Sequence, residues 1–65
     1  MRTVVSDFGV GKYRVLKLDG AKPAKEYSAY RIDGVVFSIV PLYDAVNCIA
    51  VESSDCFTGK TVEFI

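Results

Sequence analysis

The middle of the chain contains two runs of β-forming residues on either side of one turn signal. Residues 26–32 and 35–41 are rich in Val, Ile, Phe and Tyr, and Asp33-Gly34 lies between them. An Asp-Gly pair in this setting is typical of a two-residue β-hairpin. A type I′ turn needs positive φ at both central positions, which Gly accepts freely and Asp tolerates. The pattern therefore predicts an antiparallel hairpin.

The turn also fixes the strand register, and with it the face on which each side chain lies. We expect the pairs Ile32 with Val35, Arg31 with Val36, Tyr30 with Phe37, Ala29 with Ser38, and Ser28 with Ile39. One face is predicted to join the core and carries Tyr30, Ile32, Val35, Phe37 and Ile39. The other face is mixed rather than polar and carries Tyr27, Ala29, Arg31, Val36, Ser38 and Val40. The chain is therefore expected to leave some apolar surface on this second face uncovered.

Two segments before this hairpin also have the pattern of strands. Residues 12–19 are rich in β-forming side chains and end at the turn signal Asp19-Gly20. Residues 2–6 form a shorter candidate strand, followed by a predicted bend or bulge at Gly9 and Gly11.

Two further segments after the hairpin alternate between apolar and polar positions. Residues 47–53 place Ile49 and Val51 on one side, and residues 61–65 place Val62 and Phe64 on one side. Pro41 ends the preceding run or marks a bulge, because proline cannot donate a ladder hydrogen bond. Residues 42–47 fit either a bent continuation of the strand or one helical turn.

These short strands, separated by tight turns, predict one all-β domain over residues 1–65. No window contains an apolar stripe of 3.6-residue period long enough for a helix. Five or six such strands form a small antiparallel barrel or rolled sheet, with an SH3-like barrel as the first choice and an OB-like barrel as the second.

The size of the chain changes the meaning of its apolar residues. A domain of 65 residues, 51% of them hydrophobic, has a large surface relative to its core. The mean hydropathy of +0.27 is high for a small domain that works alone. An oligomer is the simplest way to cover the surplus, so a homodimer or a complex with another protein is expected.

Charge is balanced overall but unevenly distributed along the chain. The formal net charge is zero, while the cations lie mainly in residues 1–32 and the acids mainly in residues 33–65. If both halves fold into one body, these charges mix on its surface. A basic face for an anion, or a dipolar surface that orients a partner, is the alternative.

Cys48 and Cys56 are too few for a disulfide framework, and without histidine they make a poor zinc site. We expect free thiols in a reducing cytoplasm, with Cys48 partly buried on a strand and Cys56 more exposed near a turn. The N-terminal residues lack a signal-peptide pattern, and no segment approaches the length of a membrane span.

The residues available for catalysis are few. The chain has no histidine, so a Ser-His-Asp or Cys-His arrangement cannot form within it. Most acids fall at expected turns or on outward strand positions, where solvation is the ordinary role. We therefore predict no enzyme activity, no cofactor and no metal site.

The leading functional hypothesis is a non-catalytic β-domain that associates with itself or binds another protein. The expected interface carries Tyr27, Val36, Val40 and Tyr43. Pairing between exposed edge strands could extend the sheet across this contact.

The alternative hypothesis is a small β-barrel that binds nucleic acid or another anion. Basic residues alternate with tyrosines between positions 12 and 31, and the candidate contacts are Lys12, Arg14, Lys17 and Arg31. The sequence pI of about 6.1 lies far from the basic footprint that such proteins usually have.

Overall fold

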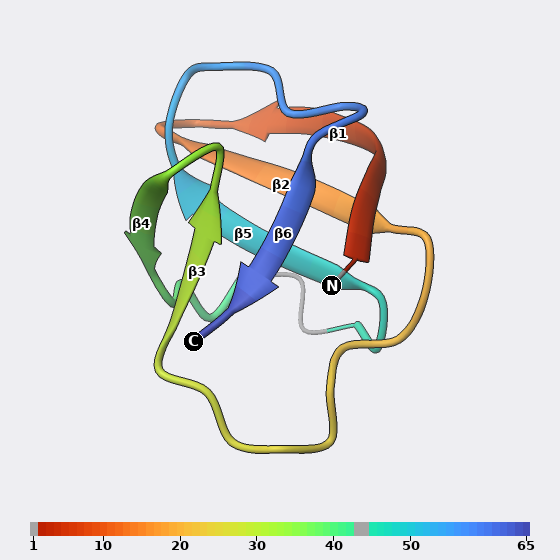
Figure 1. The fold of residues 1–65 in the computed structure, drawn as a ribbon. Helices are drawn as coiled ribbons and strands as arrows, with labels where there is room; N and C mark the ends of the chain where they lie inside the picture. Colours follow the sequence, from red (N-terminus) through yellow and green to blue (C-terminus); the bar gives the residue numbers. More distant parts are fainter. Residues whose placement is uncertain (1, 43–44) are drawn as a thin grey trace.

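The computed structural model describes residues 2–42 and 45–65, and within them six strands form one antiparallel sheet (Figure 1). The strands are β1 (Arg2–Val10), β2 (Tyr13–Leu18), β3 (Ala29–Ile32), β4 (Val35–Ser38), β5 (Cys48–Glu52) and β6 (Thr61–Phe64). Their order across the sheet is β4-β3-β6-β1-β2-β5. The sheet rolls up without closing into a barrel, so β4 and β5 remain its two edges. The predicted all-β rolled sheet is confirmed.

The Asp33-Gly34 hairpin forms with the predicted register. Asp33 and Gly34 both have positive φ, 56° and 80°, as a type I′ turn requires. The observed pairs are Ala29 with Ser38, Tyr30 with Phe37, Arg31 with Val36 and Ile32 with Val35. The two turn residues, Asp33 and Gly34, are therefore enough to fix which side chains of β3 and β4 share a face.

The first strand is longer than predicted, and its irregularity lies elsewhere. β1 continues to Val10, and Gly11, with φ of 59°, lies in the tight connection to β2. Of the bend or bulge predicted at Gly9 and Gly11, the bend at Gly11 is confirmed, whereas Gly9 lies within the regular part of β1, paired with Arg14. The register between β1 and β2 instead shifts between Val4 and Ser6, which leaves Val5 as the extra residue of a bulge.

This bulge reverses the alternation of β1 beyond Val5. Val4 is paired with Leu18, and Asp7 is paired with Leu16. Paired residues of an antiparallel ladder share a face, so Val4 and Asp7 both point to the side of the core leucines. A regular strand would have placed residues 4 and 7 on opposite faces. The bulge thus brings a carboxylate to the inner side of the roll.

The core lies inside the roll, and every strand contributes a buried residue to it except β4, which contributes the partly buried Phe37. Its buried members are Val4, Leu16, Leu18, Tyr30, Ile32, Ile49, Val51, Phe57 and Val62. Tyr27, Phe37 and Phe64 are partly buried and pack against them. The predicted inward positions Ile49, Val51 and Val62 are confirmed.

The predicted core face of the central hairpin is only partly correct. Tyr30 and Ile32 are buried and Phe37 is partly buried, but Val35 and Ile39 are exposed. The strand register is as predicted, so the prediction failed because it assumed that other parts of the chain would cover the whole inward face of β4. β4 is hydrogen-bonded only to β3, and of its inward-facing residues Phe37 packs on Phe57, with ring centroids 5.6 Å apart, whereas Val35 and Ile39 on either side of it stay exposed.

The chain is compact without a partner. Its accessible surface of 4036 Å² is close to the roughly 4,100 Å² that a folded monomer of this mass exposes. The described residues form no helix, so none of them belongs to an apolar helix that could cross a membrane. Part of the ambiguous segment 42–47 lies outside the described residues.

Candidate functional site

Among the exposed large apolar side chains of the described residues, three lie on β4 or directly after it, at one edge of the sheet. Val35 is 54% exposed, Val36 is 56% exposed, and Ile39, directly after the strand, is 41% exposed. We call these three residues the β4 surface, in which Val36 lies on the opposite face of the strand from Val35. Figure 1 shows β4 at the left margin of the molecule, outside β3. The surface therefore combines apolar side chains with the free edge of a strand.

The backbone of β4 also has hydrogen-bonding groups that β3 does not use. In the two-residue hairpin, the Val35 N–H bonds back to the Ile32 carbonyl, so this pair is hydrogen-bonded. Hydrogen-bonded and non-hydrogen-bonded pairs alternate along an antiparallel ladder. The N–H and C=O groups of Val36 and Ser38 consequently point away from β3, toward the free edge.

Next to the end of β4 is a small apolar groove with a volume of about 160 Å³. Its lining residues are Lys22, Tyr27, Tyr30, Ile39, Val40, Pro41, Leu42, Cys48 and Ile49. Ile39 therefore belongs both to this groove and to the β4 surface, which makes the two features continuous.

The predicted interface residues do not all lie together. Tyr27 and Val40 line the groove, whereas Val36 does not. The Tyr27 ring packs on Tyr30 and Phe64, with ring centroids 5.8 Å and 4.9 Å apart. Tyr27 thus supports the core as well as facing the groove. Tyr43 lies outside the described residues.

The basic residues predicted for an anion site are distributed over both faces of the sheet. Arg14 is paired with Val51 and lies on the core side of β2, whereas Lys17 lies on the opposite face. Arg31 is on β3, and Lys12 lies in the connection between β1 and β2. The structure does not gather these four side chains into one patch.

Three of these four cations contact a carboxylate. Lys12 lies 3.5 Å from Glu52, and Arg31 donates to Glu63 at 2.9 Å. Arg14 is paired with Asp7. These carboxylates offset much of the positive charge that a phosphate backbone would need to meet.

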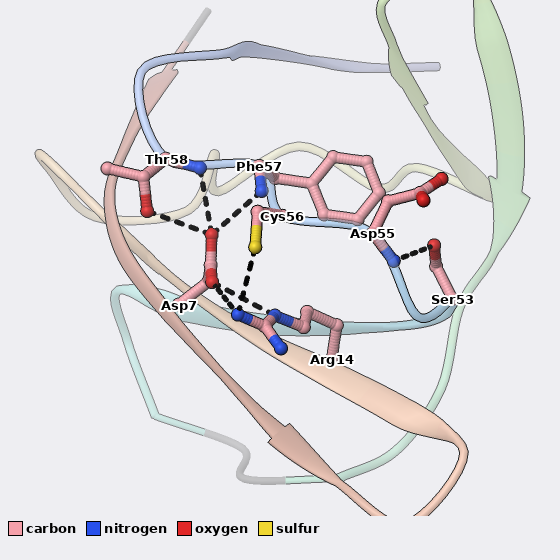
Figure 2. A network of polar contacts seen from close by, with 7 residues as sticks. All are labelled: Asp7, Arg14, Ser53, Asp55, Cys56, Phe57 and Thr58. Atoms are coloured by element: carbon pink, nitrogen blue, oxygen red, sulfur yellow. Dashed lines mark hydrogen bonds and ion pairs between the residues drawn. The ribbon is translucent and has the colours of Figure 1, made fainter.

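The pairing of Arg14 belongs to a network that the sequence did not predict (Figure 2). Asp7 Oδ1 accepts hydrogen bonds from Arg14 Nε, at 2.9 Å, and from Arg14 Nη2. Asp7 Oδ2 accepts from the Phe57 N–H at 2.7 Å and from the Thr58 N–H and hydroxyl, both at 2.8 Å. One carboxylate therefore joins β1, β2 and the loop between β5 and β6.

The network keeps Asp7 ionised although its side chain is only 3% exposed. Burial raises the pKa of Asp7, but hydrogen bonds from Arg14, Phe57 and Thr58 outweigh burial and lower the pKa from 3.8 to about 2. A carboxylate with so low a pKa is a poor general base near neutral pH. Its role in this arrangement is to hold the loop that carries Phe57 into the core.

The two cysteines lie where the sequence predicted them. Both are free thiols, with Cys48 partly buried and Cys56 exposed. Cys56 lies beside the Asp7 network, where its Sγ accepts a hydrogen bond from Arg14 Nη2 at 3.4 Å. Among residues 2–42 and 45–65, no cluster of three or more Asp, Glu or Cys side chains is placed to hold a metal ion.

No protein-family model matches this chain, and no curated protein or solved structure matches it significantly.

Proposed function

We propose that this protein is a non-catalytic β-domain that acts through protein–protein contact, with the β4 surface as its binding site. A second copy of the chain is the first expected partner. The observation that carries the proposal is the exposure of Val35, Val36 and Ile39, which lie on or directly after a strand that is hydrogen-bonded on one side only. Two free thiols fit a reducing compartment, and we propose the cytoplasm.

β4 is short, with four residues, but it lacks three other features that usually protect an exposed edge strand. Natural edges carry charged residues, proline or bulges that prevent pairing with another chain. Residues 34–40 contain no charged residue and no proline, and the paired part of β4 is regular. Because the single chain is already compact, we propose association of folded domains rather than folding upon association.

The affinity expected from this surface is modest. Three partly exposed apolar side chains offer on the order of a few hundred Å², whereas a stable interface buries about 800 Å² per partner. We therefore expect a dimer with a Kd in the micromolar range, about −8 kcal/mol. The adjacent groove can add contact area without any rearrangement of the strands.

The test is the solution mass of the wild-type chain and the Val36→Glu variant. Val36 lies across from Arg31, so a glutamate there is compatible with the hairpin but puts a charge into the β4 surface. Sedimentation equilibrium at tens of micromolar should give a dimer for the wild type and a monomer for Val36→Glu.

The matched control is Val46→Glu, since Val46 is 69% exposed and lies outside β4. This variant should dimerise like the wild type. A wild-type chain that stays monomeric up to the solubility limit would rule out self-association. A Val36→Glu chain that dimerises normally would place the contact elsewhere.

A further inference from the structure

We propose that the loop between β5 and β6 is a lid, and that its opening also loosens the β3–β4 hairpin. We call residues 53–60 the lid, and Figure 1 shows this loop crossing one end of the rolled sheet. Phe57 is the one buried residue of the lid, with 6% of its surface exposed. The inference concerns the single chain and does not depend on the proposed function.

The first attachment of the lid is to β1. Asp7 accepts hydrogen bonds from the Phe57 N–H at 2.7 Å and from the Thr58 N–H and hydroxyl at 2.8 Å. Beside them, the Gly59 N–H donates to the Val4 carbonyl at 2.8 Å. Hydrogen bonds to an ionised acceptor are roughly twice as strong as those between neutral groups. The Asp7 carboxylate is therefore the strongest of these attachments.

The second attachment of the lid is to the hairpin. The Phe57 ring packs edge-on against the ring of Phe37 on β4, with ring centroids 5.6 Å apart. Lys60 Nζ lies 2.9 Å from Asp33 Oδ2, in the turn between β3 and β4. Figure 2 shows the Phe57 ring directed away from Asp7. The lid thus bridges β1 on one side and the hairpin on the other.

Both attachments depend on the same residue, Phe57. Its N–H is held by Asp7, while its ring contacts Phe37. If the N–H is released, the ring can leave the core and Phe37 loses its aromatic partner. β4 has little else to hold it, because none of its residues is buried and its ladder joins it only to β3. Opening of the lid should therefore loosen the hairpin in the same event.

The other half of the sheet does not need to take part in this opening. β5 pairs with β2 along the whole of Cys48–Glu52, and its three central residues are buried. Segments with many buried apolar contacts open at a much higher free energy than segments with few. We therefore expect the lid and the hairpin to open together while the β2–β5 ladder stays closed.

Amide hydrogen exchange followed by NMR tests this coupling in the wild type and the Asp7→Asn variant, at a concentration that keeps the chain monomeric. The Gly59 N–H reports on the lid. The Phe37 N–H reports on the hairpin, because alternation along the ladder bonds it to the Tyr30 carbonyl. Asp7→Asn should speed exchange at both sites by about tenfold or more, and in the β2–β5 ladder by clearly less.

Coupling is reciprocal, so a change in β4 should also be detected at the lid. Phe37→Leu removes the aromatic contact and should speed exchange of the Gly59 N–H by roughly 2- to 10-fold. The matched control is Val36→Ala, on the opposite face of the same strand, which should leave the Gly59 rate unchanged. If Asp7→Asn does not fold, Thr58→Val removes one side-chain bond to Asp7 and gives the same comparison with a smaller effect.

Three results would overturn the inference. Faster exchange at Gly59 with wild-type exchange at Phe37 would mean that the lid opens alone. An equal increase at both sites and in the β2–β5 ladder would mean that Asp7 only stabilises the whole fold. A Val36→Ala variant that speeds exchange at Gly59 as much as Phe37→Leu does would mean that the ring contact carries no coupling. None of these results bears on dimerisation, which the solution mass tests separately.

Discussion

The two edges of the sheet differ in how completely their residues are buried. In β5, the consecutive residues Ile49, Ala50 and Val51 are all buried, whereas no residue of β4 is. β5 pairs with β2 along its whole length, while β4 pairs only with the four residues of β3. The β5 edge therefore stabilises the single chain, and the apolar residues of the β4 edge remain available to a second chain.

The loop after β5 adds to this difference. Asp7 holds the Phe57 and Thr58 amides, and the Gly59 N–H donates to the Val4 carbonyl at 2.8 Å. The chain that leaves β5 is thus fixed to β1 by side-chain and backbone bonds. Directly after Ser38 the backbone bond is local, from the Leu42 N–H to the Val40 carbonyl at 2.8 Å, and among the described residues longer-range bonds follow only at Val46 and Asn47, whose carbonyls accept from the Lys22 and Leu18 N–H groups.

The largest expected effect comes from truncating one isoleucine at each edge. Ile49 is 2% exposed and Ile39 is 41% exposed. Ile49→Ala should lower the free energy of unfolding by about 2–5 kcal/mol, because it leaves a cavity in the core. Ile39→Ala should lower it by less than about 1 kcal/mol. Urea unfolding at a concentration that keeps the chain monomeric measures both, and equal losses would remove the distinction between the edges.

The next effect concerns the carboxylate that holds the β5–β6 loop. Asp7→Asn should lower the free energy of unfolding at pH 7 by on the order of 2 kcal/mol, because it removes an ionised acceptor from Arg14 and the loop amides. The stabilisation by Asp7 is present above its unfolded pKa of 3.8 and is lost as pH falls toward its folded pKa of about 2.

Wild type and Asp7→Asn should therefore converge in stability between about pH 4 and pH 2. Urea unfolding at a series of pH values measures the difference. A constant difference across this range would show that Asp7 stabilises the loop by something other than its charge.

The smallest effect tests how the hairpin presents β4. Gly34 has φ of 80°, and a Cβ there would meet no atom within 4 Å. Gly34→Ala should therefore cost about 1 kcal/mol through backbone strain alone. Because the turn sets the register, the variant should also dimerise more weakly, as measured by sedimentation. A variant as stable as the wild type would mean that the turn does not constrain β4.

Local chemistry was sufficient to predict the central hairpin. The Asp33-Gly34 turn demands positive φ, and the observed pairing follows from it residue by residue. Alternation also predicted the inward positions of β5 and β6, including Ile49 and Val62. The exposure of Val35 and Ile39 could not be predicted this way, because it depends on which distant strand packs over β4.

The Asp7 network could not be predicted for a related reason. Without the bulge at Val5, regular alternation would place residue 7 on the other face of β1 from residue 4, which is the solvent side. No glycine or proline marks that bulge in the sequence. The groups that bind Asp7 belong to Phe57 and Thr58. These residues lie about 50 positions further along the chain and reach Asp7 only because of the order of the strands in the sheet. The one local signal was an acid within a β-rich segment.

The central claim is that the β4 edge, and not the β5 edge, binds a second copy of the chain. The most direct measurement is a dilution series of the ¹⁵N-labelled protein by NMR, followed amide by amide. We predict that the amides of residues 34–39 shift with concentration, while those of Cys48–Glu52 do not. Concentration-dependent shifts confined to β5, or spectra that do not change with concentration, would contradict the claim.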